Sequence, residues 1–309
     1  MAQANPALPV GMSLRGSAAR RRRESIVRGI FLGSALLTVV ISAFIIETVA
    51  VEAFGFLSKI DLGQLVGIGW FPRRGIFDVA TIVIGTMLVT VIAMVIAIPI
   101  GLASAIYLSE YATRRVRRVV KPVLEILAGI PSVVIGFFAL TVINPAFIRA
   151  IFEDASGFNL AAAGVGVGIL SIPLIASVAE DAMKAVPQSL REASYGLGAR
   201  RVTTSLRVVF PAAVSGIVAA VILATSRAIG ETMVVAVAAG APQARTINPL
   251  DPGGTMTSAM VTLATGSDQV VGDNAAFQSL FFIGLLLFVT TLLLNVLADA
   301  FVRRTRQRY

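Results

Sequence analysis

The chain of 309 residues is 56% hydrophobic and 14% charged, with a mean hydropathy of +0.86 and a net charge of +9. Such a composition cannot give a water-compatible surface, so it excludes an ordinary soluble domain and places the chain in a bilayer. The sequence has no cysteine, which excludes disulfides, and no histidine, which removes the commonest metal ligand and neutral-pH proton carrier.

Six apolar segments are long enough to cross a bilayer as helices, since a span needs about 20 residues. They cover residues 29–51, 79–108, 123–143, 161–179, 212–239 and 275–302. Backbone polar groups find no water in lipid, so we expect helices, and no alternating strands suggest a barrel. The sequence therefore predicts an all-α polytopic membrane protein with one transmembrane domain, residues 29–309, after a basic tail, residues 1–28.

Lysine and arginine concentrate in alternate connections of this six-span arrangement. They gather before the first span, between spans two and three, between spans four and five, and after span six. The other loops carry fewer: Lys59, Arg73, Arg74, Arg149 and Arg245. The positive-inside rule therefore predicts that both termini are cytoplasmic. This placement also explains the net charge by topology and contact with anionic lipid, and argues against nucleic-acid binding.

Prolines inside the predicted spans indicate kinks or breaks, because proline removes a backbone donor and clashes with the preceding turn. Pro99 lies in span two, Gly129-Ile130-Pro131-Ser132 in span three and Pro173 in span four. An interrupted helix can present backbone N–H groups to an anion, but the same pattern fits a packing kink. Residues 241–274, before span six, are rich in proline and glycine, so we expect an irregular external loop, a candidate docking surface.

The connection between spans four and five, at about 184–211, contains a loop motif. Glu192 suits the first turn of a short surface helix, with Ser189 as the other half of a candidate capping box. The small residues Ala193 and Ser194 would let another protein surface approach. Gly198 would then turn the chain, and Pro211 would start the next span. By spacing alone, an ordinary capped helix in a basic loop fits equally well.

An ionisable pair lies inside the fifth predicted span. Arg227 and Glu231 are four residues apart, on one face of a helix and close enough to pair. An ionisable residue in the membrane is costly unless it is paired or faces a cavity, so a functional role is the default hypothesis. Arg227 facing a translocation path would offer charge-assisted hydrogen bonds to an oxyanion, and Glu231 would hold the guanidinium when the path is empty. The alternative is an ion pair that fixes helix packing.

Together these motifs resemble the permease subunits of the phosphate-specific ABC importer, nearer to the PstC type than to the PstA type. The segments that carry the resemblance are 84–86, 127–136, 192–211, 226–233 and 287–295. The loop at 192–211 is similar to that of many ABC importers, whereas Arg-Ala-Ile-Gly-Glu-Thr at 227–232 is far more specific to the phosphate branch. Ser194, Val208 and Phe210 depart mildly from the loop pattern and affect only the expectation for local packing.

The resemblance implies an ABC-importer (MetI-like) permease fold in a bacterial inner membrane, with a second homologous permease as partner. Two copies of a cytoplasmic ATPase would dock on the coupling loops of the two permeases, and an extracytoplasmic phosphate-binding protein would deliver the substrate. The implied ATPase-coupling residues are Glu192, Ala193, Ser194, Gly198 and Pro211. The implied residues of the substrate path are Arg227, Glu231, Thr232 and Ser132.

The chain itself is expected to be a transport subunit that binds no cofactor or metal. It contains no G-x4-G-K-[S/T] motif, so ATP and Mg²⁺ would belong to the partner ATPase. Three alternatives stay open. One is the same architecture for sulfate, molybdate or an organic solute, which Arg227 does not separate from phosphate. The others are a secondary transporter or channel without an ATPase, and a sensor of phosphate status.

Overall fold

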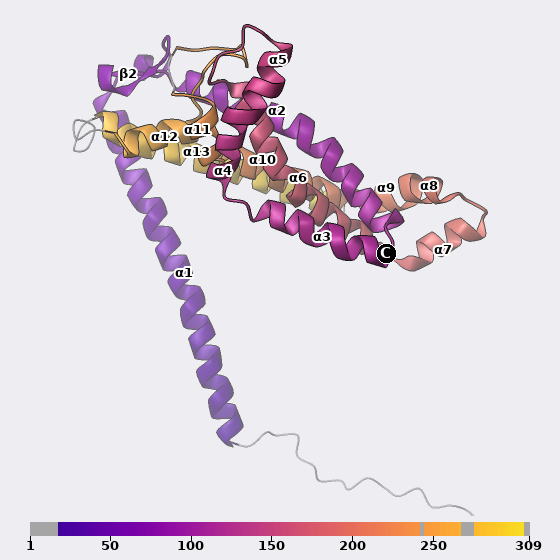
Figure 1. Cartoon of the computed structure of the whole chain (residues 1–309). Coiled ribbons are helices and arrows are strands. Elements are labelled where there is room, and N and C mark those ends of the chain that lie inside the picture. The colour runs from indigo at the N-terminus through magenta and orange to yellow at the C-terminus, as the bar shows by residue number, and fades with distance from the viewer. Residues whose placement is uncertain (1–17, 242–243, 267–274, 306–309) are drawn as a thin grey trace, which may run out of the picture. The chain divides into compact units, whose positions relative to one another are not determined.

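The computed structural model describes residues 18–241, 244–266 and 275–305, most of them in helices (Figure 1). The chain divides into two compact units, Met1–Val49 and Ala50–Tyr309, which are described separately. The first unit contains most of α1 (Ala18–Lys59), which is apolar and long enough to cross a membrane. The first predicted span is therefore confirmed as a helix, with longer bounds than 29–51.

The second unit starts with the end of α1, which is followed by a small hairpin. The hairpin comprises η1 (Leu62–Leu65), β1 (Trp70–Phe71), η2 (Pro72–Arg74) and β2 (Ile76–Phe77). The strands are antiparallel, with Trp70 opposite Phe77, and Gly75 turns the chain at φ 70°. Trp70 and Phe77 are buried with Phe56 in an aromatic cluster, in which the rings of Trp70 and Phe77 lie 6.0 Å apart. We call this side of the second unit the hairpin end.

The second unit contains most of the candidate membrane-crossing helices. They are α2 (Val79–Ile106) continued by η3 (Tyr107–Tyr111); α4 (Ser132–Phe138) continued by η4 (Ala139–Ile148) and α5 (Arg149–Ile151); α6 (Leu160–Lys184); and α13 (Ala275–Thr305). With α1, these give five candidate spans among the described residues, or six if one bent helix pair is counted as a span. The predicted polytopic helical fold is confirmed.

Close packing of α2 against α6 depends on glycines, as is usual where helix backbones approach each other in membranes. A Cβ at Gly101 would lie 2.8 Å from Cβ of Ile175, and one at Gly164 would lie 2.7 Å from Cγ2 of Ile92. Both helices run through their internal prolines, Pro99 and Pro173, without ending. The break considered for Pro99 is therefore absent from α2. Both helices stay continuous although each proline removes a backbone hydrogen bond.

The third predicted span, 123–143, has the wrong bounds. The helix that begins before it, α3 (Arg114–Ala128), ends at Gly129, and the apolar span runs from Ser132 to Ile151. The cause is Pro131, which has no N–H to donate and disfavours helical geometry at Ile130. The break divides a basic amphipathic helix from the membrane-crossing one.

The fifth predicted span, 212–239, is also divided. It contains α10 (Val214–Ile229), α11 (Met233–Ala238) and the last residue of α9 (Phe210–Ala212), which continues α8 (Arg201–Thr204) and η5 (Ser205–Val209). Residues Arg201–Ala212 and Val214–Ile229 meet at a bend of 71°, and residues 230–232 separate α10 from α11. The bend is apolar and the second interruption is only three residues long, which is why hydropathy alone predicted one helix.

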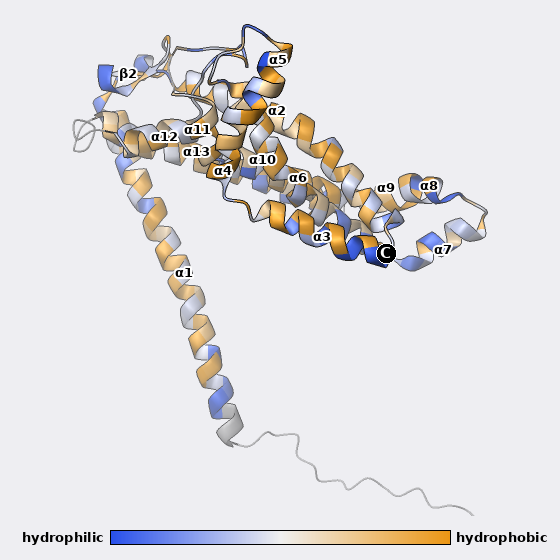
Figure 2. Ribbon diagram, in the orientation of Figure 1, coloured by the Kyte–Doolittle hydropathy of each residue, from blue (hydrophilic) through white to orange (hydrophobic). Residues whose placement is uncertain are grey.

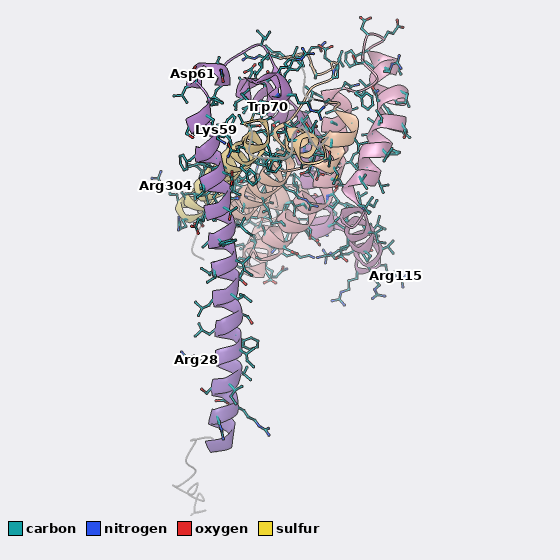
Figure 3. The ribbon with its side chains drawn as sticks, turned by 90° about the vertical axis from the view of Figure 1, so that its left-hand side faces the viewer. Arg28, Lys59, Asp61, Trp70, Arg115 and Arg304 are labelled. Atoms are coloured by element: carbon teal, nitrogen blue, oxygen red, sulfur yellow. The ribbon has the colours of Figure 1, made fainter. Side chains whose placement is uncertain are left out.

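Polar residues lie at both ends of the second unit and apolar ones between them (Figure 2). One hydrophilic region covers α7 (Gln188–Gly196) and the start of α3, away from β2. Trp70 and Arg115 accordingly lie at opposite ends of this unit (Figure 3). We call the side with α7 the α7 end; it carries the predicted coupling loop.

Candidate functional site

The short surface helix predicted in the loop at about 184–211 is present as α7. Glu192 and Ala193 are exposed on it, whereas Ser194 is half-buried and its hydroxyl lies 2.8 Å from the Thr204 hydroxyl. Gly198 has φ 78°, a left-handed conformation that favours glycine, so it turns the chain after the helix as predicted. Pro211 lies in the first turn of α9, before the bend that leads into α10.

The predicted capping box of α7 is wrong. The residue that caps the helix is Pro187, and no side chain accepts a capping hydrogen bond there. Ser189 is already inside the helix, so it cannot occupy the N-cap position of a capping box. The helix instead starts at the residue after proline, because proline fixes an extended entry at φ −55° and ψ 137°.

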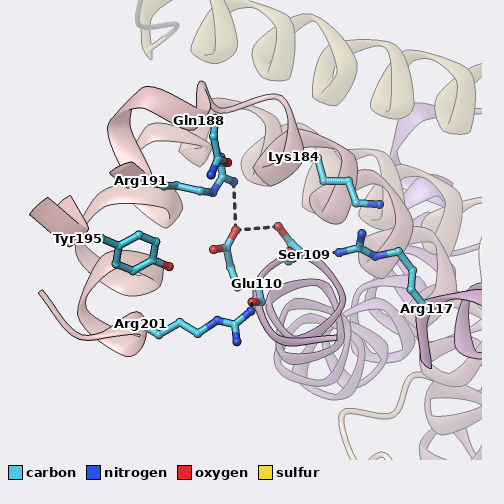
Figure 4. Close-up of a pocket in the computed structure, with 8 residues that line it drawn as sticks. All are labelled: Ser109, Glu110, Arg117, Lys184, Gln188, Arg191, Tyr195 and Arg201. Atoms are coloured by element: carbon cyan, nitrogen blue, oxygen red, sulfur yellow. Dashed lines mark hydrogen bonds and ion pairs between the residues drawn. The ribbon is translucent and has the colours of Figure 1, made fainter. Parts of the chain in front are cut away.

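A buried carboxylate that the sequence analysis missed lies beneath α7. The Glu110 side chain is 4% exposed and accepts hydrogen bonds from Arg191 Nη2 at 3.1 Å and from the Ser109 hydroxyl at 3.0 Å (Figure 4). It lines a cavity of about 620 Å³ that also contains cationic and polar side chains. The other lining residues are Ser109, Arg117, Lys184, Gln188, Arg191, Tyr195 and Arg201. Arg191 lies 81 residues from Glu110, so local spacing gave no signal for this pair.

A second buried carboxylate, Glu180 of α6, joins α3 to the same end of the bundle. Its side chain is 1% exposed and lies 3.6 Å from both Arg117 Nε and Lys121 Nζ. Lys184, one turn later on α6, forms a further ion pair with it. Three cations therefore surround Glu180, which compensates the large cost of burying a charge. Arg117 and Lys121 of α3 therefore stabilise the packing of α3 on α6, in addition to contributing to the charge bias that predicts the topology.

The predicted Arg227–Glu231 pair is not formed. Arg227 lies in the last turn of α10 and is exposed, while α10 ends at Ile229, before Glu231. A helical i, i+4 pair needs an unbroken helix, which the break at Gly230 removes. Within the described part of the chain, no ion pair joins the two residues, and Glu231 Oε1 instead accepts from the backbone N–H of Met233 at 3.2 Å.

Glu231 and Thr232 therefore belong to the connection between α10 and α11. The carboxylate at the start of α11 meets the positive end of that helix, and the Thr232 hydroxyl donates to the Gly230 carbonyl at 3.1 Å. Ser132, the first residue of α4, is half-buried one turn before Gly136. Because a Cβ at Gly136 would lie 3.2 Å from the Met233 carbonyl oxygen, α4 packs directly on α11. The four predicted path residues thus lie around two helix breaks.

The loop predicted to be irregular at 241–274 contains a buried helix, α12 (Met256–Ala264), in its described part. A capping box between Thr255 and Ser258 starts it. The Met256 N–H donates to the Thr86 hydroxyl at 2.9 Å, and the Thr257 hydroxyl donates to the Glu231 carbonyl at 2.7 Å. This helix therefore contacts both α2 and the α10–α11 break. Two consecutive glycines just before it, Gly253 and Gly254, concealed it from sequence analysis.

At the hairpin end, an ion pair joins the same loop to the start of α2. Arg245 Nη2 lies 2.7 Å from Oδ1 of Asp78, whose side chain is fully buried. Burial raises the pKa of this carboxyl. Hydrogen bonds from Arg245, Thr81 and the Gly67 backbone, together with the Arg245 charge, lower the pKa by more than burial raises it. The net result is a pKa below the usual value. The pair keeps Asp78 ionised and joins the backbone around Arg245 to the hairpin end.

Residues 97–307 match the family described as "Binding-protein-dependent transport system inner membrane component". The chain belongs to this family. Two similar relatives match it over almost its whole length. The probable ABC transporter permease protein YqgH of Bacillus subtilis is 33% identical over 91% of this chain and 92% of its own. The phosphate transport system permease protein PstC of Mesorhizobium japonicum is 30% identical over 100% of this chain and 99% of its own.

Solved structures of ABC transporter chains share the fold of this chain. A chain of the MetNI methionine ABC transporter in inward-facing conformations has a TM-score of 0.55 at 21% identity, covering 80% of this chain and all of that one. A bacterial ABC transporter involved in the import of alginate has a TM-score of 0.61 at 15% identity, covering 93% of this chain and all of that one. The predicted MetI-like permease fold is confirmed.

Proposed function

We propose that the chain is the PstC-type permease subunit of an ATP-driven importer that moves inorganic phosphate into a bacterial cytoplasm. The observation that carries the proposal is the full-length similarity to the PstC permease of Mesorhizobium japonicum, at 30% identity over 99% of that protein. A PstA permease of Mycobacterium tuberculosis is 32% identical over a smaller part of this chain, 78%. A PstC permease of the same organism is equally identical over 75% of this chain, so the PstC type is supported by the Mesorhizobium japonicum protein and by Met233 after the motif at 227–232.

In this proposal the chain pairs with a PstA-type permease, and two copies of an ATPase subunit hydrolyse the ATP. The exposed face of α7, with Glu192 and Ala193, is the docking surface for one ATPase. The turn at Gly198 and the bend after Pro211 connect this surface to α10. Movement of α7 would therefore reorient the helix that carries Arg227, as rigid gating around a central path. A phosphate-binding protein delivers substrate at the hairpin end.

Arg227 supplies the anion preference in this proposal. Its guanidinium is exposed on α10 and is not taken up by Glu231, so a phosphate oxygen or the second permease can reach it. Guanidinium groups bind oxyanions through parallel charge-assisted hydrogen bonds. Glu231, fixed to the start of α11, adds a negative charge beyond the same helix end, which would favour release of the anion.

The proposal is tested by radiolabelled phosphate uptake in cells lacking this chain and complemented with variants. The unchanged chain should restore uptake. Arg227→Gln should reduce uptake by about tenfold or more, since a charge-assisted contact made during passage is lost. Assembly with the ATPase, measured by co-purification, should stay intact. The matched control is Arg304→Gln, at an exposed arginine near the end of α13.

Two results would contradict the proposal at different levels. Phosphate uptake that is normal without the chain, together with loss of sulfate or molybdate uptake, would assign another substrate to the same architecture. Absence of an ATPase from the purified complex would remove the importer mechanism itself. Normal uptake by Arg227→Gln would leave the importer assignment unchanged but exclude Arg227 from the substrate path.

A further inference from the structure

The end of η3 and the end of α6 are held together by one arginine of α7. Arg191 Nη1 donates to the Val186 carbonyl at 2.7 Å, and Nη2 donates to the Met183 carbonyl at 2.8 Å. The same Nη2 reaches Oε1 of Glu110 at 3.1 Å. The arginine side chain is 11% exposed and the glutamate side chain 4%. A single guanidinium therefore satisfies carbonyls at the end of α6 and the carboxylate at the end of the α2–η3 helix.

Glu110 is also held from the other side of the loop. Arg201, at the start of α8, donates to the Glu110 backbone carbonyl, and its guanidinium lies 5.1 Å from the centre of the Tyr111 ring. In the close-up, Arg191 and Arg201 approach Glu110 from two directions (Figure 4). The helices before and after the Gly198 turn therefore contact the same residue of η3.

These contacts attach α7 to two spans that pack closely against each other. Gly101 and Gly164 bring α2 and α6 into backbone-level contact, and such interfaces do not deform gradually. A displacement of α7 must then either carry the ends of both spans with it or break a buried ion pair. Removing one partner of such a pair leaves an uncompensated charge in a buried place, which is strongly unfavourable.

We propose that Glu110 and Arg191 are positioning residues that transmit displacement of α7 to spans α2 and α6. This inference rests on the proposed function, in which an ATPase moves α7. Glu110 and Arg191 do not touch substrate or nucleotide in this role. They keep α7 at a fixed position relative to α2 and α6, so that ATP hydrolysis is coupled to transport.

The first experiment uses the complete importer, with both permeases, the ATPase and the binding protein, in vesicles. Phosphate transported per ATP hydrolysed is measured, with basal ATPase activity as the second readout. Glu110→Gln should lower this ratio by about three- to tenfold, the range expected when a coupling network is weakened. Basal ATPase activity and assembly should stay near the unchanged values, because the ATPase surface of α7 is intact.

The matched control is Asp181→Asn, which removes a carboxylate at the same end of α6. The Asp181 side chain is 65% exposed and lies 3.7 Å from Lys121 of α3, so it does not contact α7 through this pair. It should leave the ratio unchanged. The double variant Glu110→Gln with Arg191→Met should be no worse than the more severe single variant, because both changes break one interaction. Additive losses would contradict the proposed pair.

A second experiment measures the position of α7 without any transport. The chain has no cysteine, so spin labels can be placed on Tyr107→Cys of η3 and Leu197→Cys after α7, which are 47% and 89% exposed. The distance distribution between the labels should be narrow in the complex and should broaden in Glu110→Gln. If Glu110→Gln does not assemble, Arg191→Lys replaces it, because lysine keeps the charge but loses the forked contacts.

The outcomes separate this inference from the proposed function. If the unchanged complex has no ATPase activity stimulated by the binding protein, the proposed function fails, and the label distances still test the attachment of α7. If the unchanged complex works and the variants match it in both ratio and distance distribution, the inference is wrong. A loss of assembly in every variant, with uptake and ATPase activity falling in equal proportion, would also overturn it in favour of a structural role.

Discussion

At the residue scale, the buried pair of Asp78 and Arg245 makes the hairpin end sensitive to acid. The pKa of Asp78 is lowered in the folded protein, whereas the unfolded value is about 3.9. The pair therefore stabilises the fold fully above the unfolded-state pKa, and this stability is lost as the pH falls through the lower folded-state pKa. An external face of the membrane would meet such pH changes directly.

We expect Arg245→Met to shift the acid transition of the hairpin to higher pH. Burial, which raises the pKa of Asp78, is then opposed only by Thr81 and the Gly67 backbone. The variant should also lose about 3 kcal/mol of stability at neutral pH, because a charge stays buried without its partner. The emission of Trp70, the single tryptophan of the chain, reports the transition, since its ring is buried beside Phe77.

The control for this titration is Arg73→Met, which removes an exposed arginine from the same hairpin. It should leave the midpoint of the Trp70 emission change where it is in the unchanged chain. If Arg245→Met and the unchanged chain share one midpoint, the ion pair is not what stabilises the hairpin end against acid.

At the element scale, the contact between α2 and α6 decides the stability of the bundle. Gly101→Ala should gain up to about 1 kcal/mol in helix propensity. Its new Cβ would lie 2.8 Å from Cβ of Ile175, which is a branch point and cannot swing away. Overpacking of this kind costs about 1–3 kcal/mol, so we expect a net loss of stability. Thermal stability of the purified chain, followed by the monodisperse fraction after heating, measures it.

Gly33→Ala is the matched helical control, because a Cβ at Gly33 would have no atom within 4 Å. This variant should be neutral or slightly more stable, since alanine favours helix over glycine. A gain in stability from Gly101→Ala as well would mean that α2 and α6 separate enough to accept a methyl group.

The elements show what sequence analysis can and cannot predict in this chain. Hydropathy identified the spans because lipid imposes one simple requirement on each of them. The break before Ser132 was indicated by Pro131, but the hydropathy bounds of span three ran across it. Hydropathy also missed α12, because apolar composition does not report where a helix stops. Breaks and buried helices depend on partners such as Thr86 for Met256, 170 residues away.

The candidate sites follow the same division. The surface helix and the turn at Gly198 were predictable, because the proline before the helix and the glycine after it act locally. The Arg227–Glu231 pair was predicted wrongly, since the i, i+4 rule assumes a helix that Gly230 interrupts. Glu110 could be seen only as a charge at the end of a span. Its partner lies 81 residues further on, and only the fold brings them together.

At the scale of the whole molecule, the two polar ends of the second unit must face opposite sides of the membrane. Basic residues cluster at the α7 end, on α3, α7 and α8, as the positive-inside rule requires of a cytoplasmic face. We therefore expect the α7 end to be cytoplasmic and the hairpin end to be external. The ATPase can reach α7 only in this orientation, so the topology also bears on the proposed function.

The absence of cysteine makes this orientation directly measurable. Leu197→Cys, after α7, and Ile247→Cys, in the loop at the hairpin end, replace residues that are 89% and 74% exposed. In intact cells, whose outer barrier has been made permeable, a membrane-impermeant maleimide should label Ile247→Cys and leave Leu197→Cys unreacted. After the inner membrane is opened, both should react, which controls for accessibility. Labelling of Leu197→Cys in intact cells would invert the topology and place α7 out of reach of a cytoplasmic ATPase.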